Sequence, residues 1–330
     1  MTQKINIIAE IAQGFEGNKK LADLLLSGSI NSGADIVKFQ LIYAHELCIK
    51  EYKYFDFFKT LEMDYSVWEK LVKKAKKNKI KFYFDIFGTQ SLKVAKKLNV
   101  DGVKITTTDF YNKALIQEAL NTFKNVILSV AGTTIEELEK YLSNFTIKDN
   151  LILMYGFQSE PTQIKDNNLL RLKALKKNFN KYKIGFMDHT DGNSEYAKLI
   201  PYVAMSTGIE YIEKHITLDH KLKLEDHISG LTADVFYKFV IQFRQLETSL
   251  GNEKIVISNK EKIYKNLAAK NIIINKDLKK GAQLKVKDLS LIRVTNDIKN
   301  SFIKNPDLII NKKINKKLKK NTPLKMKDLY

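Results

Sequence analysis

The chain of 330 residues contains one cysteine, and this scarcity limits the chemistry available to it. Cys48 cannot form a disulfide within the chain, so the sequence suits a reducing compartment. No apolar run approaches the roughly 20 residues that a membrane-spanning helix needs. Residues 1–6 lead into a strand pattern without a charged and then apolar leader. The sequence therefore predicts a cytoplasmic protein with no membrane partner.

Arginine is also scarce, because only Arg171, Arg244 and Arg293 occur among 56 basic residues. The formal net charge of +19 would suit a nucleic-acid-binding protein, since basic side chains displace counterions from phosphates. The lysines, however, follow nearly every expected helix and do not form one stripe. We therefore expect no nucleic-acid partner, and a positive field that attracts a small anionic substrate.

The phosphate-binding motifs of nucleotide folds, the P-loop and G-x-G-x-x-G, are absent. Short apolar runs alternate instead with amphipathic helical patterns. The expected strands cover residues 5–12, 35–42, 81–87, 102–107, 125–131, 150–157, 183–189 and 211–216. Eight strand–helix units in about 250 residues predict a closed (β/α)8 TIM barrel. An open doubly wound sheet is the alternative.

The pattern changes after Gly251. Two segments there, K-D-L-K-K-G-A-Q-L-K-V-K-D-L and K-L-K-K-N-T-P-L-K-M-K-D-L, share one order of lysine turn, leucine and K-D-L. This repeat predicts two related turns around one compact core. We therefore expect a barrel over residues 1–251, a linker over 252–266 and a small β-rich domain over 267–330.

Polar side chains interrupt the expected strands near their C-terminal ends. Burying an unpaired charge is costly, so such residues need a partner or a function. Residues two apart in a strand face the same way, which groups several of them in pairs. The residues are Glu10, Lys38 with Gln40, Lys104 with Thr106, Ser129, and Glu213 with His215.

Two of the five histidines stand at the ends of expected strands that would be neighbours in a barrel, His189 and His215. The C-terminal ends of parallel barrel strands meet at the mouth, where such barrels carry their chemistry. The two imidazoles are therefore a candidate metal site. Lysines, hydroxyls and such a site would suit a ligand that carries phosphate and carboxylate groups.

The other three histidines are less informative. His45 and His220 lie in expected loops, where we expect them to be solvated. His227 lies in E-D-H-I-S-G beside Asp226, which would either bind a substrate hydroxyl or cap a turn.

Several motifs resemble, in order and spacing, the N-acetylneuraminate (sialic acid) synthase family. They are IIAEIA, GADIVKFQ, VKITTTD, ILSV, GFMDHT and IEKHITLD followed by EDHISG. The segment NIIINKDLKKGAQLKVKDLSLIRV likewise resembles the C-terminal antifreeze-like (SAF) domain of that family. The resemblance implies a TIM-barrel enzyme that condenses phosphoenolpyruvate with an open-chain N-acylated hexose. The products would be a nine-carbon ulosonic acid and phosphate. The cofactor would be Mn²⁺ or Mg²⁺, and the protein would form a domain-swapped homodimer.

The resemblance also implies roles for individual residues. His189 and His215 would be the metal ligands. The catalytic residues would be Glu10, Lys38, Lys104, Asp109 and Glu213. The substrate-binding residues would be Gln40, Thr107, Ser129, Gln158, Glu160, Asp226 and Arg293. Among these, Lys38, Lys104, Thr107 and Ser129 would hold phosphoenolpyruvate, whereas Gln40, Asp226 and Arg293 would contact the acceptor sugar.

The chain departs from the family pattern at several of these positions. Where the family usually has K-I-G-S-G-E, this chain has K-I-T-T-T-D, so Asp109 stands in place of the glutamate. The asparagine and tyrosine of N-x-Y-P-T are Gln158 and Glu160, and the serine before D-H-T is Met187. The N-H-N-G loop is replaced by QGFEGN. We therefore expect a changed acceptor, and the product would be neuraminic, legionaminic, pseudaminic or another ulosonic acid.

Two other classes of function compete with this interpretation. A metal-independent aldolase could use Lys38 or Lys104 as a Schiff-base nucleophile, because a desolvated barrel lysine can have a lowered pKa. A non-catalytic binding protein could use the basic field to recruit nucleic acid.

Overall fold

The computed structural model describes residues 4–252, 254–294 and 302–330. The chain divides after Asn252 into two compact units, which are described separately. Residue 253 and residues 295–301 belong to the expected linker and small domain but lie outside the described residues. No helix in the described ranges is long and apolar enough to cross a membrane.

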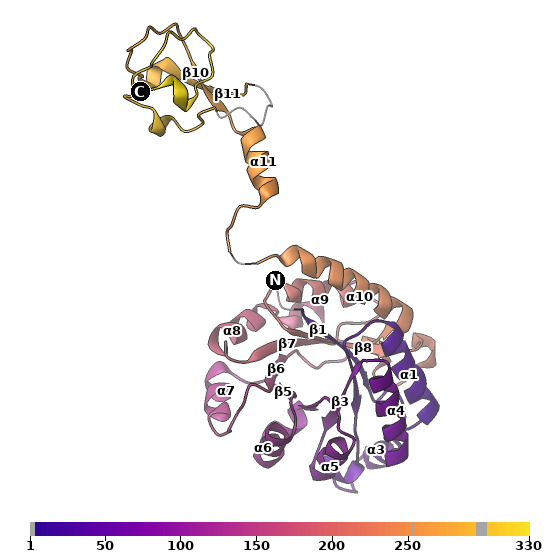
Figure 1. The fold of residues 1–330 in the computed structure, drawn as a ribbon. Helices are drawn as coiled ribbons and strands as arrows, with labels where there is room; N and C mark the ends of the chain where they lie inside the picture. Colours follow the sequence, from indigo (N-terminus) through magenta and orange to yellow (C-terminus); the bar gives the residue numbers. More distant parts are fainter. Residues whose placement is uncertain (1–3, 253, 295–301) are drawn as a thin grey trace. The chain divides into compact units, whose positions relative to one another are not determined.

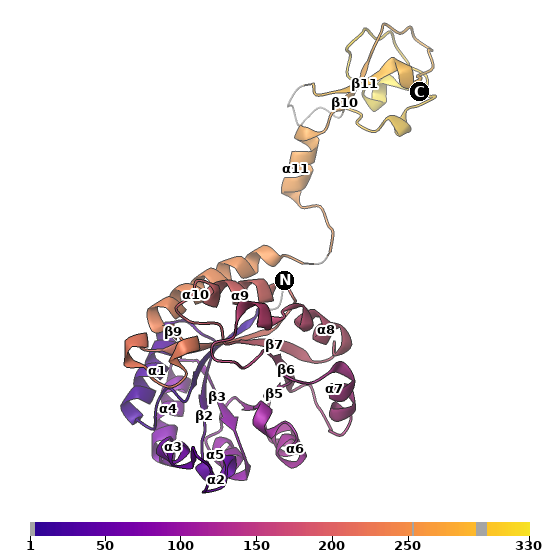
Figure 2. The same cartoon turned by 180° about the vertical axis from the view of Figure 1, so that it is seen from behind.

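The first unit is a closed parallel barrel (Figures 1 and 2). Its strands are β1 (Asn6–Ala12), β2 (Ile36–Gln40), β3 (Lys81–Ile86), β4 (Gly102–Ile105), β5 (Val126–Ser129), β6 (Leu151–Tyr155), β7 (Lys183–Asp188) and β8 (Tyr211–Thr217). Each strand pairs with the next, and β8 pairs with β1. A short strand, β9 (Leu231–Thr232), pairs in parallel with the C-terminal end of β8. The predicted barrel is confirmed, and the open sheet is wrong.

Helices surround the barrel because crossovers between parallel strands need them (Figure 1). They are α1 (Lys19–Asn31), α4 (Tyr65–Lys77), α5 (Thr89–Lys97), α6 (Lys113–Thr122), α7 (Ile135–Leu142), α8 (Leu170–Asn178), α9 (Tyr196–Met205) and α10 (Ala233–Glu247). Two short helices, α2 (Ala44–Leu47) and α3 (Phe55–Thr60), lie between β2 and α4. Side-chain caps begin some of the long helices, such as Asn18 at α1 and Thr134 at α7.

The interior of the barrel contains an apolar layer below its polar residues. This layer consists of Ile8, Ile36, Tyr83, Ile127, Ile152, Met154, Met187 and Tyr211. Two glycines leave room for its larger side chains. A Cβ at Gly102 would lie 2.6 Å from the Tyr83 ring, and one at Gly185 would lie 2.6 Å from the Met154 sulfur. The layer closes the barrel, so a ligand would enter only from the opposite end.

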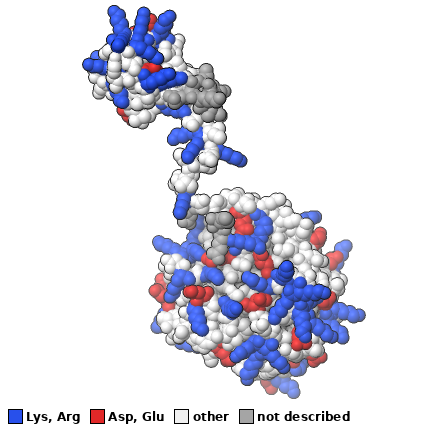
Figure 3. Space-filling view, in the orientation of Figure 1, with Lys and Arg blue, Asp and Glu red and all other residues white. Residues whose placement is uncertain are grey.

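The second unit contains a small β-rich core, as predicted, and a helix that begins within the range expected to be a linker. Helix α11 (Asn259–Ala268) precedes β10 (Asn271–Ile274), which pairs antiparallel with β11 (Leu289–Ile292). The repeated segments have matching contacts, because Asp288 pairs with Lys276 and Asp328 pairs with Lys316, each at 2.6 Å. The two turns are therefore structural copies. Lysines cover much of the visible surface of this unit (Figure 3).

Candidate active site

The polar residues that interrupt the strand patterns come together inside the barrel, above the apolar layer. Several of them lie two residues beyond a member of that layer and so face the same way: Glu10 follows Ile8 and Lys38 follows Ile36. Glu10 is paired in register with Lys38 on one side and with His215 on the other. The closure of the barrel therefore gathers side chains from strands that are far apart in sequence.

Two buried lysines and three buried carboxylates form an ion network in this layer. Lys38 Nζ lies 2.6 Å from Asp85 Oδ1 and 3.6 Å from Glu213 Oε2, and it also contacts Glu10. Lys104 Nζ lies 2.6 Å from Glu213 Oε1. All five side chains are nearly inaccessible to solvent. Each buried charge therefore has an opposite partner, which reduces the cost of removing it from water.

The network sets the protonation of its members. Burial alone would lower the pKa of Lys38, but Asp85 and Glu10 raise it above its usual range. Burial raises the pKa of Glu10, against the effect of Lys38. Burial acts in the same direction on Glu213, but Lys104 and Lys38 outweigh it and lower that pKa to about 2. Lys38 thus remains an ammonium, Glu213 remains ionised and Glu10 can hold a proton.

His189 and His215 lie side by side at the end of β7 and β8. Their ring centroids are 5.1 Å apart. Burial, with a smaller contribution from Lys104, lowers the pKa of His189 to about 4. Burial and the neighbouring His189 lower the pKa of His215 as well. Both rings are therefore neutral near pH 7, which is the form that binds metal ions.

The two histidines fit a divalent metal ion on their own chemistry. The buried Nδ1 atoms of both rings have no hydrogen-bond partner in the described part of the chain. Within that part, no group of three or more histidine, cysteine or acidic side chains is arranged to hold an ion. An ion held by His189 and His215 would therefore leave coordination positions open for substrate or water oxygens.

A second group, of hydroxyl and amide side chains, joins β4, β5, β6 and β7. The Thr107 and Ser129 hydroxyls are 2.9 Å apart, and Thr107 Oγ1 donates to Gln158 Oε1 at 3.1 Å. Gln158 Nε2 lies 3.6 Å from Met187 Sδ. The structure thus brings together three of the residues predicted to bind substrate.

A third group surrounds Asp226. The backbone N–H of Gln13 donates to Asp226 Oδ2 at 3.0 Å. The side-chain Nε2 of Gln13 donates to Gln40 Oε1 at 2.9 Å. Burial, and next the charge of Glu160, raise the pKa of Asp226 to about 7. Gln13 therefore links Gln40 to Asp226, and Glu160 lies close enough to Asp226 to raise its pKa.

Asp109 has no contact with these three groups in the described part of the first unit, and Arg293 lies in the other unit. Asp109 hydrogen-bonds to Thr108 and Asn112, and it lines a cavity of about 660 Å³ together with Glu46. Arg293 belongs to the second unit, where its Nε donates to the Ala268 carbonyl at 3.1 Å. Their predicted roles remain predictions.

Four residues around the site were not predicted from the sequence. Asp85 interrupts the apolar pattern KFYFDIF two residues after Tyr83, so the signal that identified Lys38 would also have identified it. Gln13 lies in a loop and carried no such signal. The other two are Asp188 and Lys214, which form a buried ion pair at 2.7 Å beside the histidines.

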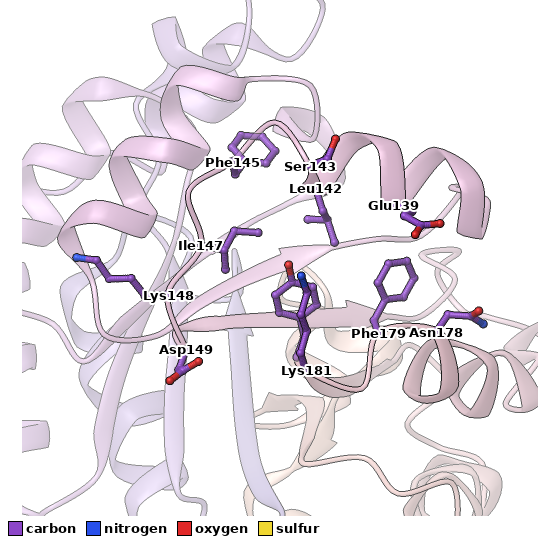
Figure 4. A pocket seen from close by; sticks show the side chains of 11 residues that line it. Glu139, Leu142, Ser143, Phe145, Ile147, Lys148, Asp149, Asn178, Phe179 and Lys181 are labelled. Carbon is purple, nitrogen blue, oxygen red and sulfur yellow. The ribbon is translucent and has the colours of Figure 1, made fainter.

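Another cavity lies at the opposite end of the barrel (Figure 4). It has a volume of about 510 Å³ and lies among the segments that precede β6 and β7, where Phe145, Lys148, Phe179 and Lys181 line it. Barrel enzymes place their chemistry at the C-terminal ends of the strands. This cavity is therefore separate from the candidate active site.

Comparison with known proteins agrees with this geometry. An uncharacterized protein of Methanocaldococcus jannaschii is 31% identical, over 93% of this chain and 89% of its own length. The N,N'-diacetyllegionaminic acid synthase of Legionella pneumophila is 29% identical, over 91% and 88%. A solved structure of N-acetylneuraminic acid (sialic acid) synthetase from Leptospira borgpetersenii, in complex with citrate, is 26% identical. It superposes with a TM-score of 0.74 and covers 81% of this chain and 93% of that one.

Two family descriptions match most of the sequence. Residues 25–255 match the NeuB family, and residues 272–329 match the SAF domain. The resemblance inferred from the motifs is confirmed, since these ranges cover most of the barrel and of the small β-rich unit. The chain therefore belongs to the NeuB family and carries a SAF domain after its barrel.

Proposed function

We propose that this chain is a phosphoenolpyruvate-dependent synthase that acts on an N-acylated hexose. The product is a nine-carbon ulosonic acid, and phosphate is released. One observation carries the proposal: two adjacent neutral imidazoles, His189 and His215, stand at the barrel mouth next to buried lysines that are held by carboxylates. The activities by which the Legionella and Leptospira relatives are named support the same class of reaction.

The buried lysines would bind phosphoenolpyruvate. Lys38 and Lys104 offset the charge of its phosphate and carboxylate groups, and Thr107 and Ser129 offer hydroxyl donors. Gln158 bonds to Thr107 and would orient it toward the same ligand. Because the ammonium groups already have carboxylate partners, the ligand would have to share or displace them.

The acceptor sugar would occupy the cluster around Asp226. Gln40 and Asp226 would hydrogen-bond its hydroxyl groups, and Glu160 adds a carboxylate where the family usually has tyrosine. Asp109, another departure from the family pattern, would contribute from the loop after β4. These residues favour an acceptor that differs from N-acetylmannosamine.

The reaction forms one carbon–carbon bond. The methylene carbon of phosphoenolpyruvate attacks the aldehyde carbon, and water adds to the resulting cation. The bond between that carbon and the bridging oxygen then breaks, and phosphate leaves with the oxygen. One proton of the water ends on the new hydroxyl and the other on phosphate. Glu10 and Glu213 would move these protons, since the raised pKa of Glu10 lets it hold one and Glu213 is ionised.

His189 and His215 would hold Mn²⁺ or Mg²⁺. When bound, such an ion supplies a Lewis acid that polarises the aldehyde oxygen. The two residues keep their neutral form through burial, so they need lose no proton before they bind it.

The Schiff-base alternative fits Lys38 poorly. A lysine nucleophile must lose its proton, whereas the carboxylates around Lys38 raise its pKa. Borohydride reduction with pyruvate should therefore trap no adduct on Lys38 or Lys104. A stable covalent product on either lysine would favour the aldolase.

The direct test measures phosphate release from phosphoenolpyruvate with Mn²⁺ across a panel of N-acylated hexoses. We expect release with one or a few of these sugars, and none without a sugar or with EDTA. No turnover with any sugar would contradict the synthase and favour a binding protein.

Loss of either metal ligand should abolish the reaction and leave the fold intact. We expect His189→Ala and His215→Ala each to weaken Mn²⁺ binding at least 100-fold by calorimetry, because a packed barrel does not need a catalytic metal to fold. Circular dichroism should match the parent protein. His45→Ala is the control, since His45 is exposed. Unchanged affinity in both single variants would remove these residues from the site.

The proposal includes a homodimer in which Arg293 of one chain serves the acceptor site of its partner. The scarcity of arginine supports this role, because a chain that otherwise uses lysine has kept a planar, multi-donor group at this position.

A further inference from the structure

The strands that carry the two histidines are joined by a second buried polar group on their outer face. Because side chains alternate along a strand, Asp188 and Lys214 point toward the helices while His189 and His215 point into the barrel. The register of β7 and β8 pairs Asp188 with Lys214. Their exposed fractions are 1% and 0%. This ion pair is therefore fully enclosed and has no access to substrate.

The pair closes a ring of hydrogen bonds with Thr190. Lys214 Nζ donates to Asp188 Oδ2 at 2.7 Å and to the Thr190 carbonyl at 2.9 Å. Asp188 Oδ1 accepts from the Thr190 N–H at 3.1 Å and from its hydroxyl at 2.6 Å. Both chain neighbours of His189 are thus tied to the residue that precedes His215. We call Asp188, Thr190 and Lys214 the outer clamp.

Stability alone does not account for such a group. A buried ion pair contributes little compared with well-packed apolar side chains of similar size. What it does provide is one defined arrangement, since an Asp188 carboxylate oxygen and the Thr190 carbonyl must both meet one ammonium group. The clamp therefore restricts the geometry of the turn that carries His189.

The two imidazoles need this restriction from the backbone. Metal-binding histidines are usually oriented by a hydrogen bond from their second ring nitrogen to a carboxylate or carbonyl. Among the described residues, no hydrogen bond reaches either ring nitrogen of His189 or His215, so neither ring is oriented in this way. The His189 carbonyl is held instead, by Thr162 N–H at 2.9 Å and Ser229 Oγ at 3.0 Å. The direction of each ring follows from its backbone.

We propose that the outer clamp consists of positioning residues, which hold His189 and His215 at the separation that one divalent ion requires. This inference rests on the proposed metal site. It extends that site to three residues that touch neither the ion nor the substrate.

The main test removes both charges and keeps the fold. In the double variant Lys214→Met, Asp188→Asn, the amide oxygen can still accept from Thr190 and no charge is left buried alone. We expect the dissociation constant for Mn²⁺, measured by calorimetry, to rise 10- to 100-fold, as for other residues that orient metal ligands. Lys176→Met is the matched control. It breaks the Lys176–Glu210 pair beside the other end of β8 and should leave that constant unchanged.

If the double variant does not fold, two single substitutions at Thr190, which change fewer atoms, test the role of the outer clamp. Thr190→Val removes the hydroxyl donor to Asp188 at constant shape, and Thr190→Ser keeps it. We expect weaker Mn²⁺ binding in Thr190→Val and parent-like binding in Thr190→Ser. Equal binding in both, within twofold of the parent, would overturn the proposal.

A readout without metal separates this inference from the metal site itself. With ¹³C-labelled histidine, only five ring signals need assignment. In metal-free protein we expect the His189 and His215 signals to shift or broaden in the double variant and in Thr190→Val, while His45 stays unchanged. If the parent binds no Mn²⁺, the proposed metal site fails and these spectra alone decide the clamp. Unchanged ring signals with only a lower melting temperature would reduce the clamp to a structural role.

Discussion

At the residue scale, the site depends on charges that are paired before any substrate binds. Lys38 contacts three carboxylates and Lys104 contacts one of the same three. Because an ammonium group must stay charged to bind phosphate, this pairing suits Lys38 to the anionic ligand proposed for it. The same pairing makes it a poor nucleophile. The network thus favours a role for Lys38 in binding an anion over a role as a covalent nucleophile.

Asp226 gives a prediction about pH. Its folded-state pKa of about 7 lies above the value of about 3.9 expected in the unfolded chain. The folded protein therefore binds an extra proton between these values, and the stability that this proton contributes is lost as the pH rises through 7. Asp226→Asn cannot lose such a proton. We expect the variant to gain about 1–2 kcal/mol over the parent between pH 4 and pH 8, after allowance for partial exposure.

Thermal unfolding at a series of pH values measures this difference. Asp56→Asn is the control, because Asp56 is exposed on α3 and should leave the pH dependence unchanged. A parallel pH dependence in the parent and in Asp226→Asn would contradict the raised pKa.

At the element scale, the loops after β7 and β8 support each other. The Gly192 N–H donates to the Ile228 carbonyl at 2.7 Å. Ser229, one residue further along, holds the His189 carbonyl. The loop that carries Asp226 is therefore fixed against the turn that carries His189, which links the proposed acceptor site to the proposed metal site.

Gly192→Ala should disturb both loops. A Cβ at Gly192 would lie 1.9 Å from the Gly230 carbonyl oxygen, and a backbone atom at that distance must move. We expect a loss of about 1–3 kcal/mol in the free energy of unfolding. The KM for the acceptor should rise more than the KM for phosphoenolpyruvate. Chemical denaturation and steady-state kinetics measure the two effects.

Gly230→Ala is the matched comparison for this prediction. Its Cβ would lie 3.2 Å from the Thr217 side chain, so a small adjustment can accommodate it. We expect a smaller effect than at Gly192. An effect at Gly230 as large as that at Gly192 would show that the contact between the loops is not the cause.

At the scale of the whole molecule, the charge is uneven. Residues 253–330 contain 21 basic and 7 acidic residues, so they carry +14 of the net charge of +19. We expected the lysines to be spread along nearly every helix, but residues 253–330 carry most of the net positive charge. A positive second unit in each chain would attract anionic substrates toward the assembly.

The proposed homodimer gives a complementation test. We expect Arg293→Ala to raise the KM for the acceptor about 10-fold or more, because a charged hydrogen bond is lost, and to leave the KM for phosphoenolpyruvate unchanged. Mixed with inactive His215→Ala chains, it should recover part of the activity, since one mixed site would combine an intact barrel with an intact arginine. Lys313→Ala, an exposed lysine in the same unit, is the control. No recovery in verified mixed dimers, or a monomer in sedimentation, would contradict the shared site.

The sequence alone determined the architecture and much of the site. Alternating apolar runs and helical patterns predicted the barrel, because strands buried on both faces must be apolar. Because side chains alternate along a strand, the spacing of Glu213 and His215 predicted that they share one face. Their position at the end of a strand predicted that they lie at the mouth of the barrel. These properties are local, so they can be read from neighbouring residues.

Only the tertiary structure decided which side chains meet and which of them hold protons. The pairing of Lys38 with Asp85, and of Lys214 with Asp188, depends on the register between strands, which no single segment encodes. The link from Gln13 to Asp226 joins the first loop of the barrel to the last. Protonation depends on burial and on charges from other strands, and both exist only once the barrel has closed.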